Sequence, residues 1–344
     1  MEKWSQDSSS ESPRSMSLVV SSMSARGRSL KLGRELVEIL RDGGWQVDVH
    51  VTNSTSDVEY EASLSDHPFI GALGGDGYLT AAARGCIGHP SPLLPFPGGR
   101  GNDLCRSLGI GADSFEWARK VAAASTEEIN SWIRPLDAMQ VKSGDGTYVV
   151  LGVVSLGVDA TANQIANNSW FRSGPLAYAW GAALAALGKY SPLEISGTIE
   201  GEIPKEYPGR DTDTAIAHAE AQGTGVFRPV LGGWVTSVAN TGWIGGGVNL
   251  TPQSRTDDGL LEIITLEGIP RFRAIGKLAK VLSSRALDDP VVHIYEGTQV
   301  HLEKPAGLEV MADGDVIGRL PMDVKVLPSA LRVVAPPRAT EETK

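Results

Sequence analysis

The chain contains 344 residues, of which 41% are hydrophobic and 21% are charged, and its formal net charge is −10. It is long enough for two domains that each bury a core, and its acidic balance argues against nucleic-acid binding, which needs clustered cations. The two cysteines, Cys86 and Cys105, do not form a CxxC pair, so neither a disulfide framework nor a cysteine-rich zinc site is supported. We expect a soluble globular protein of the reducing cytoplasm.

Residues 1–15 are rich in serine and lack the basic start and apolar core of a signal peptide, so we expect a disordered tail. From residue 17 to about residue 140, apolar strand patterns alternate with helical patterns. The predicted strands are 17–20, 45–51, 68–73 and 92–96, and the clearest helix is 30–44. This alternation predicts an α/β domain with a parallel sheet, whose ligands should gather at the carboxyl ends of the strands.

After about residue 140, strand patterns follow one another with short turns between them. The predicted strand segments are 147–160, 194–201, 233–242, 259–268, 291–297 and 298–300, with helical patterns at 173–190 and 270–286. A polar stretch without apolar period, 208–224, is expected to be an exposed loop. We therefore predict a second domain that is mostly antiparallel β, either a sandwich or a flattened barrel.

Two glycine-rich loops each follow a predicted strand and precede a predicted helix. They are LGGDG at 73–77 and PGGRGNDLCRSLG at 97–109. Glycine lets successive backbone N–H groups converge on a phosphate at a helix N-terminus. Neither loop matches the GxxxxGK[ST] or GxGxxG motifs, and one such junction alone could be a tight turn. Two of them on neighbouring strands favour a nucleotide-phosphate site.

The order of these motifs resembles that of the diacylglycerol kinase catalytic family, which includes bacterial lipid kinases and relatives of sphingosine kinase. GGDG at 74–77 and PGGRGNDL at 97–104 are similar to the family's GGDGT and PxGTxNDF signatures. GPLAY at 174–178, DDGLLEI at 257–263 and DGD at 313–315 resemble three further family segments in the same order. Motifs in matching order span residues 17–336.

The resemblance implies a particular fold and a particular pair of cofactors, ATP and Mg²⁺. Residues 16–137 would form a nucleotide-binding α/β domain of the phosphofructokinase and NAD kinase type, completed by 318–337. Residues 138–317 would form a β-sandwich domain that binds lipid. The residues implied in ATP binding are Thr52, Gly74, Gly75, Asp76, Gly77, Tyr78, Leu79, Thr80, Gly99, Arg100, Gly101 and Asn102.

The same resemblance implies roles for the downstream aspartates. A structural magnesium would be held near the DDG turn by Asp258 with the backbone oxygens of Arg255 and Leu260. The catalytic residues implied are Asp313 or Asp315 as proton acceptor, with Asp76 organising the metal and phosphates. Phosphoryl transfer to a hydroxyl does require in-line placement, a divalent metal and a carboxylate that receives a proton. From spacing alone, aspartates before glycines could equally be hairpin turns.

Several positions depart from the family's pattern. Tyr78 and Arg100 stand where the family has threonine, and Ala81 stands where it often has an acid. Asp315 replaces a glutamate, and Ser21–Ser22 replace Asn-Pro. Arg100 could add a cation to bound phosphates, or it could fill the pocket and block ATP.

The leading hypothesis is a lipid kinase that transfers the γ-phosphoryl group of ATP to the hydroxyl of diacylglycerol or a similar lipid. A non-catalytic relative that binds nucleotide or lipid as a regulator is the alternative, and NAD kinase is less favoured. The basic segment 269–287 could dock on anionic lipid, although a solvated helix face explains it as well. We expect a lipid partner taken from a membrane surface, no nucleic-acid partner and a peripheral cytoplasmic location, and we leave a homodimer open.

Overall fold

In this computed structural model the described residues are 14–22, 28–99, 101–157, 192–201, 225–229, 231–244, 247–270, 273–274, 277, 289–313 and 315–338. The predicted helix at 173–190, most of the one at 270–286 and the predicted loop at 208–224 lie outside them. Arg100 and Gly314 also lie outside them. No helix in the described ranges is long and apolar enough to cross a membrane.

The first half of the chain interleaves parallel strands with helices. The strands are β1 (Ser15–Ser21), β2 (Gln46–Thr52), β3 (Phe69–Gly74) and β4 (Leu93–Pro97), in the spatial order β2-β1-β3-β4. The helices are α1 (Arg28–Asp42), α2 (Thr55–Ser63), α3 (Asp76–Gly85), α4 (Asp103–Ser107), α5 (Ser114–Ala123) and α6 (Thr126–Ser131). The four predicted strands and the predicted helix are all present, which confirms the α/β class of this half.

The burial of these elements explains why the sequence forms them. β1 and β3 are buried along their whole length, as expected for central strands covered on both faces. Leu36 and Leu40 lie one turn apart on α1, and both are fully buried in the same core as β1. Ser54, Asp113 and Ser125 cap the N-termini of α2, α5 and α6 by accepting backbone N–H groups with their side chains.

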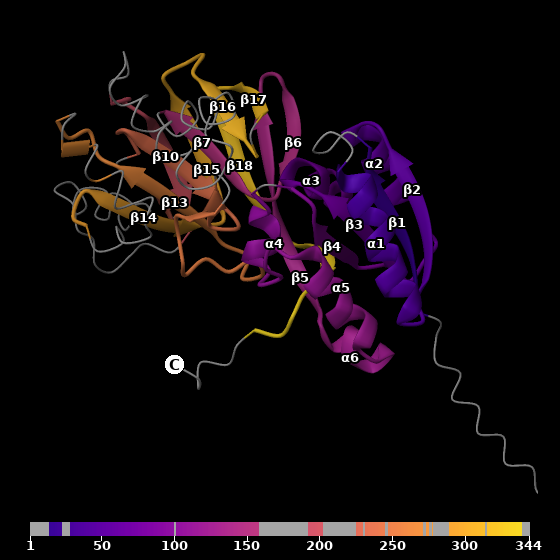
Figure 1. The fold of residues 1–344 in the computed structure, drawn as a ribbon. Helices are drawn as coiled ribbons and strands as arrows, with labels where there is room; N and C mark the ends of the chain where they lie inside the picture. The colour runs from indigo at the N-terminus through magenta and orange to yellow at the C-terminus, as the bar shows by residue number, and fades with distance from the viewer. Residues whose placement is uncertain are drawn as a thin grey trace, which may run out of the picture.

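Further strands extend this first sheet to ten strands; the first of them pairs with β4 in parallel, and the pairings beyond it are antiparallel. β18 (Met322–Val334) lies beside β4 and is followed by β15 (Gln299–Lys304), β8 (Ser196–Glu200) and β9 (Val226–Phe227). β5 (Ile133–Ser143) pairs with β18 and with β6 (Gly146–Val150). Because β18 pairs with β15 near its start and with β4 near its end, it runs between the two halves of the molecule (Figure 1).

A second sheet contains six antiparallel strands in the order β14-β13-β10-β7-β16-β17. These are β7 (Val153–Gly157), β10 (Val235–Ala239), β13 (Leu261–Leu266), β14 (Val292–Gly297), β16 (Glu309–Ala312) and β17 (Asp315–Arg319), and β11 (Trp243–Ile244) pairs separately with β12 (Val248–Asn249). Val154, Val238 and Ile263 of this sheet share one buried cluster with Val141 and Val300 of the first. The two sheets therefore pack face to face, which confirms the predicted antiparallel β half.

One predicted strand segment is divided in the structure. The stretch 147–160 contributes most of β6 to the first sheet and all of β7 to the second, with Leu151 and Gly152 between them. A Cβ at Gly152 would overlap the carboxylate of Asp313, so a close approach between distant segments requires glycine there. The apolar pattern continues across this turn, and it therefore carries no sign of the break.

The N-terminal boundary lies slightly earlier than expected. β1 already begins at Ser15, within the segment 1–15 that the sequence suggested as a tail, and residues 1–13 lie outside the described residues. The guanidinium of Arg14 donates hydrogen bonds to the carbonyls of Gly43 (2.8 Å) and Ala124 (2.7 Å). These contacts fix the start of the strand because they satisfy carbonyl groups at two helix ends.

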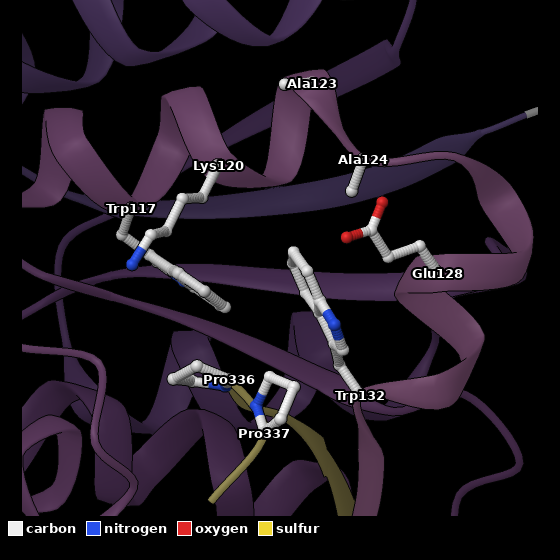
Figure 2. Close-up of a pocket in the computed structure, with 8 residues that line it drawn as sticks. All are labelled: Trp117, Lys120, Ala123, Ala124, Glu128, Trp132, Pro336 and Pro337. Atoms are coloured by element: carbon white, nitrogen blue, oxygen red, sulfur yellow. The ribbon is translucent and has the colours of Figure 1, made fainter. Parts of the chain in front are cut away.

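The last residues of the described chain return to the first half. Ala335 N donates to the carbonyl of Trp132 at 3.1 Å. Beside this contact is a pocket of about 320 Å³ whose lining is shown in Figure 2: Trp117, Lys120, Ala123, Ala124, Glu128, Trp132, Pro336 and Pro337. The rings of Trp117 and Trp132 are stacked at 5.7 Å. The pocket is lined by none of the residues that sequence motifs marked for nucleotide, metal or proton transfer.

Candidate active site

The carboxyl ends of the four parallel strands place the predicted nucleotide residues at one edge of the sheet. Thr52 is the last residue of β2 and Gly74 the last of β3, while Pro97 ends β4 directly before the second glycine loop. In the sheet, β2 lies on one side of β1, and β3 and β4 lie on its other side, so the connection after β1 and the connection after β3 run in opposite directions. This reversal is the topological switch point at which ligands of open α/β sheets bind.

The two glycine loops touch each other through their backbones. Gly98 N donates to the carbonyl of Gly74 at 2.7 Å. A Cβ on Gly99 would overlap the Cα of Gly75, so a larger residue would push the loops apart. Asn102 adopts a left-handed conformation (φ 56°), and its side-chain Oδ1 accepts from Gly99 N at 2.9 Å. The second loop is thereby held in one shape against the first.

The N-terminus of α3 is open toward solvent at this junction. Gly75 is its N-cap residue and provides no side-chain cap, and Gly77 in the first turn is exposed with no atom within 4 Å of the position of a Cβ. A ten-residue helix presents backbone N–H groups and a partial positive charge at this end. The residues present therefore fit an anionic phosphate group, because the backbone can approach it closely.

Asp76 connects the two loops. Its Oδ1 accepts a hydrogen bond from Leu104 N, in the first turn of α4, at 3.2 Å. Burial raises the pKa of the Asp76 carboxyl, while the backbone N–H groups of Leu104, Asp103 and Asn102 oppose that rise. One carboxylate thus lies beside the N-terminal ends of both α3 and α4.

Thr52 and Tyr78 form a buried pair beside the first glycine loop. Their hydroxyl oxygens are 2.7 Å apart. The Tyr78 ring packs against Gly74, where a Cβ would lie 2.6 Å from ring atom Cγ. Burial raises the pKa of Tyr78 to about 12, so the phenol stays neutral. Leu79, the next residue of α3, is fully buried in the core, which leaves only its backbone for a ligand.

Asp313 enters the site from the second sheet. It lies directly after β16 in a left-handed conformation (φ 48°), and its Oδ1 accepts from Val153 N at 3.3 Å. Its Oδ2 accepts from the hydroxyl of Thr80 at 3.4 Å, although the two residues are 233 positions apart in the chain. Thr80 lies one helical turn beyond Asp76 on α3, so Asp76 and Thr80 share the helix face that meets Asp313.

The electrostatics of Asp313 follow from this position. Burial raises the pKa of its carboxyl from near 3.8 to about 6, and the negative charge of Asp76 adds to the rise, while the Val153 N–H opposes it. Asp315, two residues later, is exposed at the start of β17, and the contacts that join Thr80, Val153 and Asp313 do not include it. Of the two candidate proton acceptors, Asp313 is the one that lies against α3.

A second link between the halves passes through Arg106 on α4. Its Nε donates to the carbonyl of Gly101 at 3.0 Å, and its guanidinium lies 5.9 Å from the ring centre of Trp243 on β11. The contact fastens the second glycine loop to the β half by a cation–π interaction. Arg100, the departure from the family pattern in this loop, lies outside the described residues.

The DDG turn lies apart from these contacts. Asp258 is exposed, and its Oδ1 accepts from Leu260 N at 3.0 Å. The Nε of Arg255 lies 3.6 Å from Oδ1 of Asp257. No cluster of three or more histidine, cysteine, aspartate or glutamate side chains within the described ranges is suited to a metal ion. Any metal at this turn would therefore depend on backbone carbonyls as well as on Asp258.

Sequence reasoning did not identify two buried polar residues near this turn. Asp137 on β5 is almost completely buried, and its carboxylate accepts from Gly259 N (2.8 Å) and Ser329 N (2.6 Å). Asn240 is fully buried, and its Nδ2 donates to the carbonyls of Asp137 (2.9 Å) and Leu151 (3.0 Å). Both residues hold turns together where the two sheets meet. The signal in the sequence that could have marked them is a lone polar residue inside an apolar strand, for Asp137, or directly after one, for Asn240.

Comparison with known families bears on the same two halves. The model of the diacylglycerol kinase catalytic domain matches residues 15–141, and that of the YegS C-terminal NAD kinase beta sandwich-like domain matches residues 152–335. The chain belongs to the diacylglycerol kinase and YegS family of lipid kinases. The two models divide this family member close to the passage from β6 to β7, where the chain moves from the first sheet to the second.

Individual relatives cover nearly the whole chain of this family member. A diacylglycerol kinase of Mycobacterium tuberculosis strain H37Rv is 24% identical over 318 residues, covering 91% of this chain and 93% of the relative. A protein of Pseudomonas putida KT2440 named "Probable lipid kinase YegS-like" is 26% identical, covering 88% and 90%. The crystal structure of a diacylglycerol kinase from Bacillus anthracis str. Sterne superposes with a TM-score of 0.64 at 15% identity, over 94% of this chain and 97% of that one. This structural likeness supports the two-part fold.

Proposed function

We propose that this member of the family is an ATP- and Mg²⁺-dependent kinase that phosphorylates the free hydroxyl of diacylglycerol or a closely similar lipid. The observation that carries the proposal is the meeting of Asp313, from the β half, with Thr80 on the helix that begins at Asp76. A phosphoryl donor and a proton-accepting carboxylate are then adjacent. The naming of the Mycobacterium tuberculosis relative supports diacylglycerol as the substrate.

The donor end of the proposed site is the paired glycine loops. Gly74, Gly75, Gly77 and Gly99 leave room for phosphates next to backbone N–H groups, and Asn102 keeps the second loop in place. Asp76 fixes the separation of α3 and α4 through Leu104. Because the loops are held together by their own backbone and Asn102 contacts, little ordering is needed when the nucleotide binds.

The acceptor end is Asp313. With a pKa of about 6 the carboxylate is mostly ionised at neutral pH, and a raised pKa makes it a better acceptor of the lipid hydroxyl proton. Val153 N and the Thr80 hydroxyl fix its two oxygens, so the free lone pairs have defined directions. Bound Mg²⁺ would neutralise phosphate oxygens, and we propose that a structural Mg²⁺ is held by Asp258 and the carbonyls of Arg255 and Leu260.

We further propose that the lipid is taken from the cytoplasmic surface of a membrane and reaches the crevice between the two halves. A bilayer is where a substrate with two acyl chains resides, so the enzyme would associate with it peripherally. The basic segment 269–287, on which the sequence argument for lipid docking depended, lies largely outside the described residues. The membrane association therefore remains a prediction.

A lipid-panel assay tests the proposed function. The purified chain is incubated with γ-labelled ATP, Mg²⁺ and mixed micelles of diacylglycerol, monoacylglycerol, ceramide or sphingosine, with soluble NAD as a further acceptor. We expect label in the diacylglycerol product and its loss in Asp313→Asn. Label in NAD alone would instead identify an NAD kinase.

The engaged Thr52–Tyr78 pair favours one alternative, a relative that binds nucleotide or lipid without turnover. Both hydroxyls of that pair already have a partner, whereas a nucleotide site of the usual family pattern has a threonine in place of Tyr78. A nucleotide-dependent rise in melting temperature without transfer to any acceptor in the panel would support this regulator and contradict the kinase.

A further inference from the structure

A hairpin of the β half carries a tryptophan that meets the α/β half. β11 pairs with β12, and the carbonyl of Gly242, directly before β11, accepts from Leu250 N at 2.7 Å. Ile244 is buried in one cluster with Val153 of the second sheet. Because successive strand residues point to opposite sides, Trp243 is directed away from that cluster, and it is half-buried. The packing of the hairpin therefore holds the Trp243 ring in a fixed place.

Arg106 on α4 contacts that ring and the second glycine loop at the same time. α4 lies at the boundary between the two halves (Figure 1). The guanidinium carbon of Arg106 lies 5.9 Å from the ring centre of Trp243, and its Nε donates to the carbonyl of Gly101 at 3.0 Å. A guanidinium that lies over an indole keeps its N–H groups in its own plane, so it can make both contacts together. The ring therefore restricts the directions in which Arg106 can donate.

The Gly101 carbonyl belongs to the same planar peptide group as the N–H of Asn102. The two groups point in opposite directions, so fixing the carbonyl also fixes the N–H. Burial raises the pKa of the Asp76 carboxyl, and backbone N–H groups, that of Asn102 among them, oppose the rise. Leu104 N, two residues further on, donates to Oδ1 of Asp76 at 3.2 Å. Arg106 therefore orients one of the backbone groups that face the Asp76 carboxylate.

The internal bonds of the second glycine loop set its shape but not its place relative to the β half. Asn102 accepts from Gly99 N at 2.9 Å, and both residues belong to the loop. The contact between Arg106 and Trp243, in contrast, crosses from one half to the other. The β half also supplies Asp313, which meets α3. The two halves must keep one mutual position for a phosphoryl donor and its acceptor to be in line, and the Arg106 contact fastens the donor side.

We propose that Arg106 and Trp243 are positioning residues for the nucleotide. Trp243 holds Arg106, and Arg106 orients the peptide between Gly101 and Asn102 toward Asp76, which keeps the donor end of the site in its binding shape. The inference rests on the proposed kinase function and deepens it, because a residue of the β half then sets the affinity of the α/β half for MgATP. Neither side chain acts on the reacting atoms itself.

The test is isothermal titration calorimetry of MgATP into the full chain in the absence of lipid. Arg106→Gln removes the cation and Trp243→Leu removes the aromatic face, and each should raise the MgATP dissociation constant about fivefold or more. Trp243→Phe keeps an aromatic face for the guanidinium and should stay within about twofold of the wild type. The matched control is Arg119→Gln, because Arg119 is an exposed arginine on α5 in the same half. It should leave the dissociation constant unchanged.

Two further readings separate positioning from a general loss of structure. The double variant Arg106→Gln/Trp243→Leu should bind MgATP no more weakly than Arg106→Gln alone, because the two side chains act through one link. In the lipid assay, the single variants should raise the KM for MgATP more than they lower kcat, and they should leave the KM for the lipid unchanged. A structural defect would instead lower kcat at an unchanged KM, because it reduces the amount of folded enzyme.

The outcomes are distinct. If the wild type and both single variants bind MgATP equally well, the inference is overturned and the kinase proposal stands. Additive losses in the double variant also overturn the inference, since they show two separate effects. A wild type that binds no MgATP contradicts the proposed function and the inference with it. A circular dichroism spectrum confirms that each variant is folded, and Trp243→Leu provides the second reading should Arg106→Gln not fold.

Discussion

Replacing Asp313 with asparagine should stabilise the folded protein while it removes activity. The pKa of this carboxyl rises from near 3.8 to about 6 on folding, chiefly because of burial and also because of the Asp76 charge. A tenfold change in proton affinity corresponds to about 1.4 kcal/mol, so the ionised carboxylate costs the folded state ~3 kcal/mol at most. Because Asp313 is only partly buried, we expect the variant to gain ~1–3 kcal/mol at pH 7.5.

The hydrogen bonds of Asp313 should survive the substitution. An asparagine Oδ1 can still accept from Val153 N, and its Nδ2 can donate to the Thr80 hydroxyl, which reverses the direction of the present bond. The gain is therefore electrostatic and should depend on pH. Well below pH 3.8 the wild-type carboxyl is protonated in both the folded and unfolded states, so the two proteins should be similarly stable. As pH rises from about 4 to 6, only the unfolded wild type loses its proton, and wild-type stability falls relative to the variant.

Thermal melts of the nucleotide-free protein in EDTA, at pH 4.5 and pH 7.5, measure this effect. The melting temperature of Asp313→Asn should exceed that of the wild type by a few degrees at pH 7.5 and by much less at pH 4.5. Asp315→Asn is the matched control because its carboxylate is exposed, and it should shift little at either pH. A variant that is less stable at pH 7.5, or whose difference from wild type is the same at both pH values, would refute the reasoning about Asp313.

Three further predictions concern the glycine loops, the Thr52–Tyr78 pair and the second sheet. Gly99→Ala should lower the free energy of unfolding by at least ~1 kcal/mol, because the added Cβ overlaps the facing loop. The Cβ of Gly77→Ala meets open space, so this variant should keep the wild-type melting temperature or slightly exceed it, yet lose the stabilising shift caused by ATP. An intact ATP shift would exclude Gly77 from the nucleotide site. Tyr78→Phe should lower the free energy of unfolding, measured by denaturant titration, by ~1 kcal/mol because it leaves the buried Thr52 hydroxyl without its partner. An unchanged denaturation midpoint would argue against that hydrogen bond. Burial raises the pKa of Glu262 to about 8, so the stability of the wild type should fall between pH 5 and pH 8. Over that range the melting temperature of Glu262→Gln should rise relative to that of the wild type. A difference between the two proteins that does not depend on pH would contradict this.

The sequence predicted the strands, the first helix and the glycine junctions because each depends on neighbours in the chain. Short apolar runs indicated β1, β3 and β4, period-two alternation indicated β2, and apolar residues at helical spacing indicated α1, while glycine marked the two places where loops approach each other. Family motifs, which are also local, indicated the aspartates of the site. The order of the elements was therefore accessible without any knowledge of their packing.

The contacts that complete the site were not accessible in this way. Thr80 and Asp313 are 233 positions apart, and their meeting depends on how two sheets pack. The choice between Asp313 and Asp315 depends on a left-handed turn at Asp313, a conformation that the sequence DGD does not specify. Asp137 was missed because an aspartate in an apolar strand has no local partner; its partners, Gly259 and Ser329, come from distant turns.

The most direct test of the account is the single-turnover rate of γ-phosphoryl transfer from ATP to diacylglycerol, measured at saturating Mg²⁺ and nucleotide in the wild type, Asp313→Asn and Asp315→Asn. If Asp313 receives the hydroxyl proton, Asp313→Asn should transfer roughly 10²–10⁴-fold more slowly with nearly unchanged ATP affinity, while Asp315→Asn stays within a few-fold of the wild type. Equal rates in the wild type and Asp313→Asn, or a loss confined to Asp315→Asn, would contradict the account.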